Sequence, residues 1–118
     1  MTAKEFPNDT TIIQVGEPVE YISLISKGSV LLTLPSGEMT LKIGDAIGLH
    51  DICQGQHTCS YTTLEDTTLL QYPCSNPEDL LALLRENSEL SVLYINSMTR
   101  QICEVMDMYV LSSFFADN

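Results

Sequence analysis

The chain has 118 residues, the length of one domain with one core. Its 16 acidic and 5 basic side chains give a formal charge of −11, which disfavours nucleic acid and anionic membranes as direct partners because both would repel the chain. The apolar fraction of 44% excludes a disordered chain, and no apolar run approaches the roughly 18–20 residues of a membrane span.

Residues 1–8 lack the apolar segment of a secretory signal, so we expect a cytoplasmic protein with reduced thiols. The four cysteines are Cys53, Cys59, Cys74 and Cys103. Their spacing contains no C-x-x-C pair, which excludes the usual zinc knuckle and redox motifs.

The segment from residue 10 to residue 73 is predicted to form short strands. It contains β-rich stretches at 10–15, 21–26, 29–34, 38–43, 61–64 and 67–72. Gly16-Glu17-Pro18, Gly28, Pro35-Ser36-Gly37 and Gly44-Asp45 separate several of them. Met39, Leu41 and Ile43 alternate with polar residues, which predicts a half-buried strand and, with the preceding turn, a hairpin. The pattern favours a sandwich, roll or barrel of antiparallel strands.

Residues 76–112 are predicted to be helical. Asn76 is a suitable N-cap, Pro77 suits the first helical position, and Asp79 lies near the positive end of the helix dipole. The expected buried face of this short helix consists of Leu80, Leu81, Leu83 and Leu84. Ser88 can cap a second, longer helix.

An apolar seam runs along the second helix, with steps of three, four, three and four residues. Its members are Ile95, Met98, Ile102, Val105 and Tyr109, widened by Cys103, Met106 and Val110. Such a seam either packs on the β-core of its own chain or pairs two subunits, and the width of the stripe favours both. The apolar tail formed by Val110, Leu111, Phe114 and Phe115 is expected to continue into a further segment or to pack on a neighbour.

Three motifs appear in order along the strand region. They are Ile12-Ile13-x-x-Gly16-Glu17-Pro18, Tyr21-Ile22-x-x-Ile25-x-x-Gly28-Ser29-Val30 and Leu41-x-x-Gly44-Asp45-x-x-Gly48. Together with the helix at 77–87 before a long helix, they resemble the cyclic nucleotide-binding domain of catabolite activator protein-like (Crp/Fnr) regulators. The resemblance implies a mainly β fold, a jelly-roll-like β-roll followed by a short helix and a long dimerisation helix.

The phosphate-binding cassette of that family departs from the pattern here. The family places a ribose-binding Glu after the third glycine and a phosphate-binding Arg about ten residues later, where this chain has Leu49 and, near the Arg position, Thr58. No Lys or Arg lies between Lys42 and Arg85. Losing one partner of a buried charged pair costs about 2–5 kcal/mol, and tenfold in affinity is about 1.4 kcal/mol. We therefore expect no tight binding of cyclic AMP or cyclic GMP. A contact from Arg100 of the long helix is a hypothesis that would restore a cation.

The candidate ligand-binding residues are taken from this degenerate cassette. They are Gly48, Leu49, His50, His57, Thr58, Cys59 and Tyr61. His50, Cys53, His57 and Cys59 lie within ten residues, but their irregular spacing matches no standard closed metal site, so we expect neither a metal nor another cofactor. The chain also lacks a G-x-S-x-G elbow and a P-loop, which argues against an enzyme.

The sequence therefore predicts one regulatory domain over residues 1–118, with the roll at about 6–74 and helices at about 76–112. In the favoured hypothesis, a cavity lined by Leu49, Ile52, Cys59 and Tyr61 senses a less anionic or apolar small ligand. The long helix then relays the signal within a homodimer to an output domain outside this chain. The alternative is a ligand-free dimerisation or docking module. An open, walled pocket would support sensing. A cassette collapsed on Leu49 would support the module, and side chains of residues 44–74 filling the roll interior would exclude sensing in that cavity. Neither hypothesis includes contact with nucleic acid or membrane.

Overall fold

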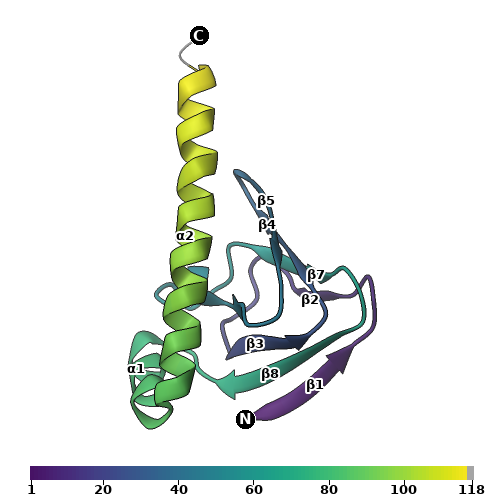
Figure 1. Ribbon diagram of the computed structural model, residues 1–118, viewed down its shortest axis with the longest axis vertical. Helices are drawn as coiled ribbons and strands as arrows, with labels where there is room; N and C mark the ends of the chain where they lie inside the picture. The colour runs from purple at the N-terminus through teal and green to yellow at the C-terminus, as the bar shows by residue number, and fades with distance from the viewer. Residues whose placement is uncertain (117–118) are drawn as a thin grey trace.

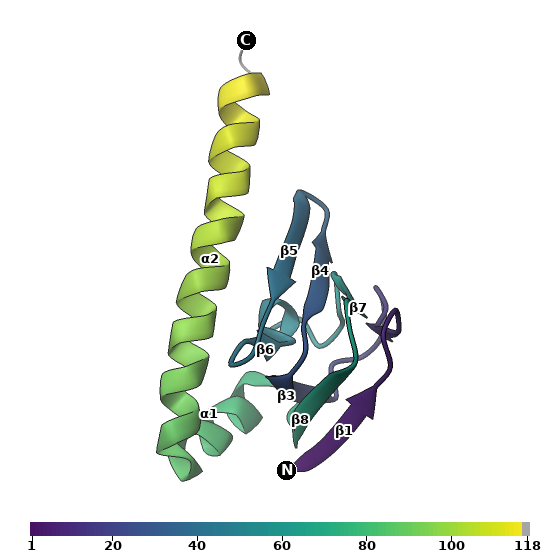
Figure 2. The same ribbon diagram turned by 45° about the vertical axis from the view of Figure 1, so that its right-hand side comes forward.

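The computed structural model describes the backbone of residues 1–116 and the side chains of residues 1–108. Two four-stranded antiparallel sheets face each other, and two helices lie along one side of them (Figures 1 and 2). The elements are β1 (Thr2–Phe6), β2 (Thr11–Ile13), β3 (Tyr21–Lys27), β4 (Val30–Leu34), β5 (Gly37–Leu41), β6 (Ala46–Ile47), the 3₁₀ turn η1 (Leu49–Asp51), β7 (Ser60–Thr63), β8 (Thr67–Pro73), α1 (Pro77–Glu86) and α2 (Ser88–Ala116). The predicted mainly β roll with C-terminal helices is confirmed. None of the helices within the described residues is both long and apolar enough to cross a membrane.

The main core lies between the two sheets, whose strand orders are β1-β8-β3-β6 and β2-β7-β4-β5. Strands β4 and β5 form the predicted hairpin, with Val30 opposite Leu41. Met39 and Leu41 are buried in this core, as their alternation predicts. Ile43 is not: it follows the end of β5 and is 68% exposed, because the chain turns at Gly44-Asp45 before the alternation can continue.

A second apolar cluster lies between the outer face of the β3-containing sheet and the helices. Ile22, Leu24 and Ala46 of the sheet pack beneath Leu90 and Tyr94 of α2. Helix α1 begins as predicted, since the Asp79 N–H donates to Asn76 Oδ1 at 2.8 Å. Its partly buried leucines are Leu80, Leu83 and Leu84. The prediction for Leu81 is wrong: it points to solvent and is 54% exposed.

The roll begins earlier than the sequence predicts. Residues Thr2–Phe6 form the edge strand β1, which pairs along its whole length with β8. Its first four residues are exposed and only Phe6 is partly buried, so no hydrophobic alternation marks the strand in the sequence. Strand β1 extends the sheet that carries the helices.

Gly28 occupies one tight corner of the roll, between β3 and β4. Its φ is +92°, and a Cβ at this position would lie 2.5 Å from Thr67 Oγ1 and 2.6 Å from the Asp66 carbonyl oxygen. Both the backbone conformation and the close approach of β8 therefore require glycine here, as the sequence predicts.

Helix α2 carries two different apolar faces. The face toward the roll consists of Leu90, Tyr94, Ser97, Gln101, Val105 and Met108. Ile95, Met98 and Ile102 of the predicted seam are 57%, 43% and 48% exposed. Val105 belongs to the predicted seam but packs on the roll core. It lies three residues after Ile102 of the seam and four residues after Gln101 of the roll face, so both faces reach it. The helix continues to Ala116, past the predicted end at 112, and its upper part extends beyond the roll (Figure 1). The side chains of Tyr109, Val110, Leu111, Phe114 and Phe115 lie outside those described.

Candidate functional site

The cassette begins at Gly48, where β6 passes into η1. Gly48 has a φ of +100°, and a Cβ would lie 3.3 Å from the Tyr21 carbonyl oxygen, so a larger residue would strain this corner. The Gly48 N–H donates to Tyr61 Oη at 3.3 Å, which fixes the start of η1 against β7. The following residues Leu49 and His50 then lie at the surface of the roll, half-buried.

A fully buried carboxylate lies inside the cassette. Asp51, at the end of η1, has no exposed surface. Its Oδ2 accepts from the Thr58 N–H at 2.9 Å, and its Oδ1 accepts from Thr58 Oγ1 at 2.6 Å. Thr58 lies near the position at which the family resemblance places the phosphate-binding Arg. The two donors of this residue are therefore taken by a negative charge that the chain itself supplies.

His57 packs against this carboxylate and is 3% exposed. Its Nδ1 lies 3.7 Å from Asp51 Oδ2, too far for a hydrogen bond, and has no other partner. Burial lowers the pKa of His57, although the charges of Asp51 and Glu17 act in the opposite direction. The imidazole is therefore neutral near pH 7 and cannot serve as the missing cation.

Cys59 and Tyr61 fill the roll next to the cassette. They are 2% and 0% exposed and belong to the core cluster between the sheets, while Ile52 packs into the second cluster. Burial raises the pKa of both the Cys59 thiol and the Tyr61 hydroxyl, so both remain protonated. The prediction of an apolar cavity lined by these residues is therefore wrong. Ile52, Cys59 and Tyr61 are packed into the two cores, and only Leu49 faces an open pocket.

That pocket lies between η1 and α2 and has a volume of about 260 Å³. Leu49 and His50 line its roll side, and Met98, Gln101 and Ile102 line its helix side. Its lining is mainly apolar and contains no Asp, Glu, Lys or Arg. It brings together two of the predicted ligand-binding residues and two of the predicted interface residues, but not His57, Thr58, Cys59 or Tyr61.

A buried polar network fastens α2 to the roll beside this pocket. Gln101, 1% exposed, donates through Nε2 to the Ala46 carbonyl oxygen at 3.0 Å and to Ser97 Oγ at 2.8 Å. Its Oε1 lies 3.0 Å from His50 Nε2, which must be the donor. The Ala46 N–H in turn donates to Ser97 Oγ at 2.9 Å. The helix is thus connected to both β6 and η1.

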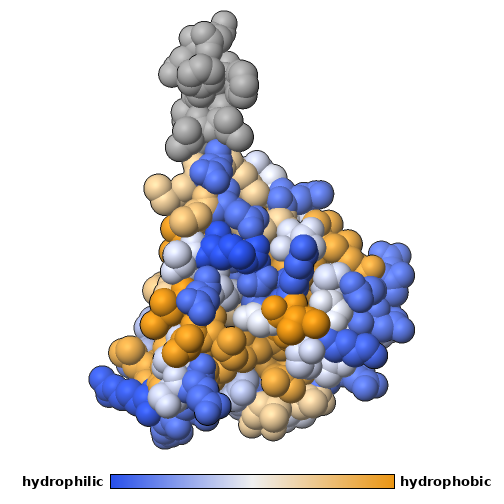
Figure 3. Space-filling model, in the orientation of Figure 1, coloured by the Kyte–Doolittle hydropathy of each residue, from blue (hydrophilic) through white to orange (hydrophobic). Residues whose placement is uncertain are grey.

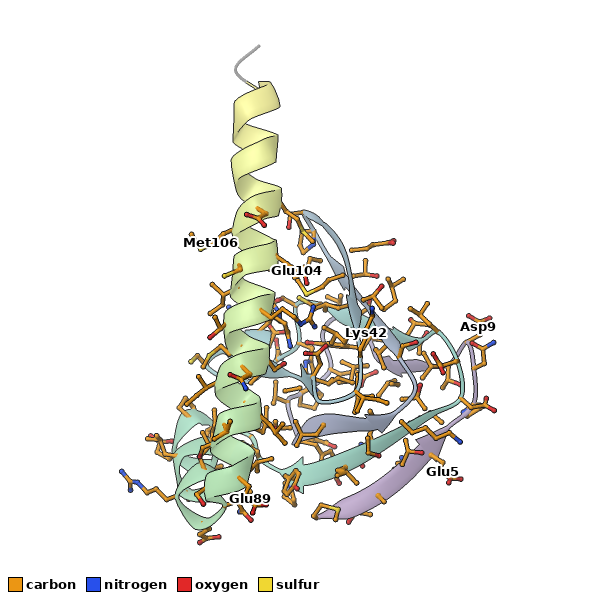
Figure 4. All side chains as sticks on the ribbon, viewed as in Figure 1. Glu5, Asp9, Lys42, Glu89, Glu104 and Met106 are labelled. Carbon is orange, nitrogen blue, oxygen red and sulfur yellow. The ribbon has the colours of Figure 1, made fainter. Side chains whose placement is uncertain are left out.

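Arg100 extends this network away from the pocket. Its guanidinium pairs with Asp45 and with Glu104 one turn later, and Nε lies 3.3 Å from Asp45 Oδ1. Glu104 lies on the side of α2 that faces the roll, and Lys42 lies across from it on the roll (Figure 4). Arg100 therefore neutralises acidic neighbours and does not supply a cation to the cassette.

Within the described side chains, no three His, Cys, Asp or Glu residues converge in a way that would hold a metal ion. Cys53 is exposed while Cys59 is buried, so these two thiols of the cluster seen in the sequence lie in different environments.

Sequence reasoning missed Ser97 and Gln101, although a signal for them exists. Leu90, Tyr94, Ser97 and Gln101 follow one another with steps of four, three and four, the spacing of a buried helical face. Two polar residues on such a face need buried hydrogen-bond partners, which predicts a polar connection between the helix and the roll.

The model of the cyclic nucleotide-binding domain matches residues 3–87, which cover the roll and α1. The chain belongs to the cyclic nucleotide-binding domain family. No curated protein matches the chain in sequence. Membership confirms the resemblance seen in the sequence.

Solved structures share the fold of this family member. The catabolite activator protein of Thermus thermophilus is 27% identical with a TM-score of 0.67, over 96% of this chain and 55% of that one. The heme domain of CooA from Carboxydothermus hydrogenoformans is 14% identical with a TM-score of 0.73, over 98% and 83%. The N-terminal domain of a transcriptional regulator from Streptomyces coelicolor A3(2) is 22% identical with a TM-score of 0.56, over 91% and 77%. This chain thus spans about half the length of the Thermus protein.

Proposed function

We propose that this chain is a regulatory, non-catalytic domain that does not bind cyclic AMP or cyclic GMP tightly and acts through α2. The observation that carries the proposal is the buried Asp51 carboxylate, which takes the backbone and hydroxyl donors of Thr58. The 55% coverage of the Thermus catabolite activator protein supports an output domain outside this chain.

The carboxylate opposes a cyclic phosphate by direct repulsion. Two like charges 4 Å apart repel by about 1 kcal/mol in water and about 4 kcal/mol at the effective dielectric of a protein surface. No Lys or Arg of the cassette offsets this term, and His57 is neutral. A nucleotide would therefore lose both its cation partner and the donors that Asp51 already uses.

A thermal-shift titration of the chain with each nucleotide, up to millimolar concentration, tests the proposal. A ligand at 100 times its dissociation constant stabilises the folded state by about 2.7 kcal/mol. We expect no shift for the unaltered chain. The double variant Asp51→Ala, Thr58→Arg should gain nucleotide-dependent stabilisation. The control Thr33→Arg, Glu38→Ala, which changes the charge by the same amount at exposed positions of β4 and β5, should not. Saturable binding of either nucleotide to the unaltered chain at micromolar concentration would overturn the proposal.

The pocket between η1 and α2 is the proposed site of a different, uncharged ligand. Leu49, Met98 and Ile102 offer apolar contacts, and His50 and Gln101 offer hydrogen-bonding groups. A ligand that competes for the His50–Gln101 hydrogen bond would loosen one of the connections between α2 and the roll. Binding would thus change how firmly α2 is held against the roll.

The exposed stripe of α2 is proposed to pair two copies of the chain. Ile95, Met98 and Ile102 are each at least 43% exposed, and Met106, also exposed, points away from the roll (Figure 4). Apolar atoms also gather along the lower part of the helix in the space-filling view (Figure 3). Sedimentation equilibrium should give a dimer that Ile102→Asp dissociates, while Asn96→Asp on another face does not. A monomer at high concentration would refute the pairing.

A ligand-free dimerisation module is the second candidate. It is supported by the packing of Cys59 and Tyr61, which leaves the inside of the roll beside the cassette filled. A fragment screen observed by NMR separates the two candidates. Ligands that shift Leu49 and Gln101 together favour the sensor, and a screen without hits at this pocket favours the module.

A further inference from the structure

A second crevice, of about 160 Å³, opens on another side of the cassette. Its walls come from both sheets and from the loop between β2 and β3, and no residue of α1 or α2 lines it. It is therefore separate from the pocket between η1 and α2. The buried ring of His57 lines both this crevice and the inside of the cassette.

The inward-facing row of the helix-bearing sheet turns polar at this crevice. Phe6, Ile25 and Leu69 face the core between the sheets. Because side chains alternate along a strand, the residues two positions away share that face, and these are Lys4, Ser23 and Gln71. All three line the crevice. Polar side chains turned inward cost free energy unless they are hydrogen-bonded, so this end of the roll suits a polar occupant.

The tautomer of His57 decides which polar group fits. Its Nδ1 faces the Asp51 carboxylate, which can only accept a hydrogen bond. A bare Nδ1 lone pair there would be repelled, so the ring proton belongs on Nδ1. In a neutral imidazole, Nε2 is then an acceptor. Only Nδ1 of the two ring nitrogens is fully buried without a partner, so Nε2 is the nitrogen that is open to the crevice.

Carboxylates stand at the rim of the same crevice. Glu17 and Glu20 are exposed, and Glu17 is tied to His57 because the His57 N–H donates to the Glu17 carbonyl oxygen at 2.8 Å. One carboxylate oxygen of Glu17 accepts from the Gln14 N–H at 3.2 Å, and the other is free to bind. The cation of the lining, Lys4, lies over the Phe6 ring, 5.2 Å from its centroid. The crevice thus offers acceptors and net negative charge.

We propose that this crevice binds the ammonium group of a small primary amine, held between His57 Nε2 and the carboxylate of Glu17. A crevice of about 160 Å³ suits an amine with a short carbon chain. Asp51 links this crevice to the cassette, since the same carboxylate accepts from Thr58 and faces Nδ1 of His57. The inference does not depend on whether the other pocket binds a ligand.

Titration with ethylammonium chloride, followed by NMR of the His57 ring nitrogens, tests the inference. Before titration, the spectrum should place the ring proton on Nδ1. Ethylammonium should then shift Nε2 saturably, whereas sodium chloride and sodium propionate should not. Glu17→Gln should weaken binding at least threefold, and the matched variant Glu38→Gln, an exposed carboxylate on β5, should leave it unchanged.

Several results would overturn the inference. A proton on Nε2 in the free protein would remove the acceptor. So would a response to ethylammonium that does not saturate, or an equal response to propionate. Equal weakening by the two glutamate variants would show that only the overall charge attracts the amine.

Discussion

Replacing Gln101 by leucine should loosen the attachment of α2 to the roll at a cost of about 2–4 kcal/mol. Leucine has a similar size but leaves the buried Ala46 carbonyl oxygen without the donor that lies 3.0 Å away. A buried polar group without a partner costs about 1–3 kcal/mol. His50 Nε2 also loses its acceptor, but it is half-buried and can turn to water, so it adds less.

Urea denaturation measures this loss directly. With a slope of about 2 kcal/mol per molar urea, the midpoint should fall by about 1–2 M. Asn96→Leu makes the same chemical change at an exposed position of α2 and should change stability by less than about 0.5 kcal/mol. If the two variants differ by less than that amount, the network does not hold the helix and the reasoning is wrong.

Three further measurements test the buried groups. Burial lowers the pKa of His57, so the unfolded state binds more protons and the free energy of unfolding falls as the pH drops below about 6.5. The variant His57→Gln should therefore lose less stability than the parent chain between pH 7 and pH 5. Gly28→Ala should cost more than about 3 kcal/mol in thermal melts, whereas Gly16→Ala, with a φ of +95° and open space, should cost about 1–2 kcal/mol of backbone strain; equal costs would contradict the packing argument. Two of the four thiols should react quickly with a disulfide reagent in the folded protein, because Cys59 and Cys74 are buried and burial raises the pKa of each; four fast thiols would refute this.

The sequence predicts those parts of the fold that local chemistry dictates. Asn76 caps α1 because its side chain suits the free N–H groups of a helix start, and Gly28 marks a corner that only glycine tolerates. Strand β1 has no such signal, because its pairing with β8 is made by backbone groups that every residue carries. The alternation that includes Ile43 fails because a turn ends the strand first.

The site was predictable in its absences but not in its contents. The lack of Lys and Arg in the cassette is visible in the sequence. The hydrogen bonds from Thr58 to Asp51 are not, because they form only when η1 folds back onto Thr58. Likewise, the seam of α2 is visible, but its division into a core face and an exposed face depends on where the helix rests on the roll. Val105 belongs to one face and Ile102 to the other for this reason.

The hydrogen bonds to Ala46 also close one open edge of a sheet. Strand β6 is an edge of its sheet, and an open edge invites pairing with strands of other molecules. The side chains of Ser97 and Gln101 occupy both outward-pointing backbone groups of Ala46, so this edge offers no template for a foreign strand. Growth of that sheet is left to the opposite edge, β1, where the charges of Lys4 and Glu5 discourage it.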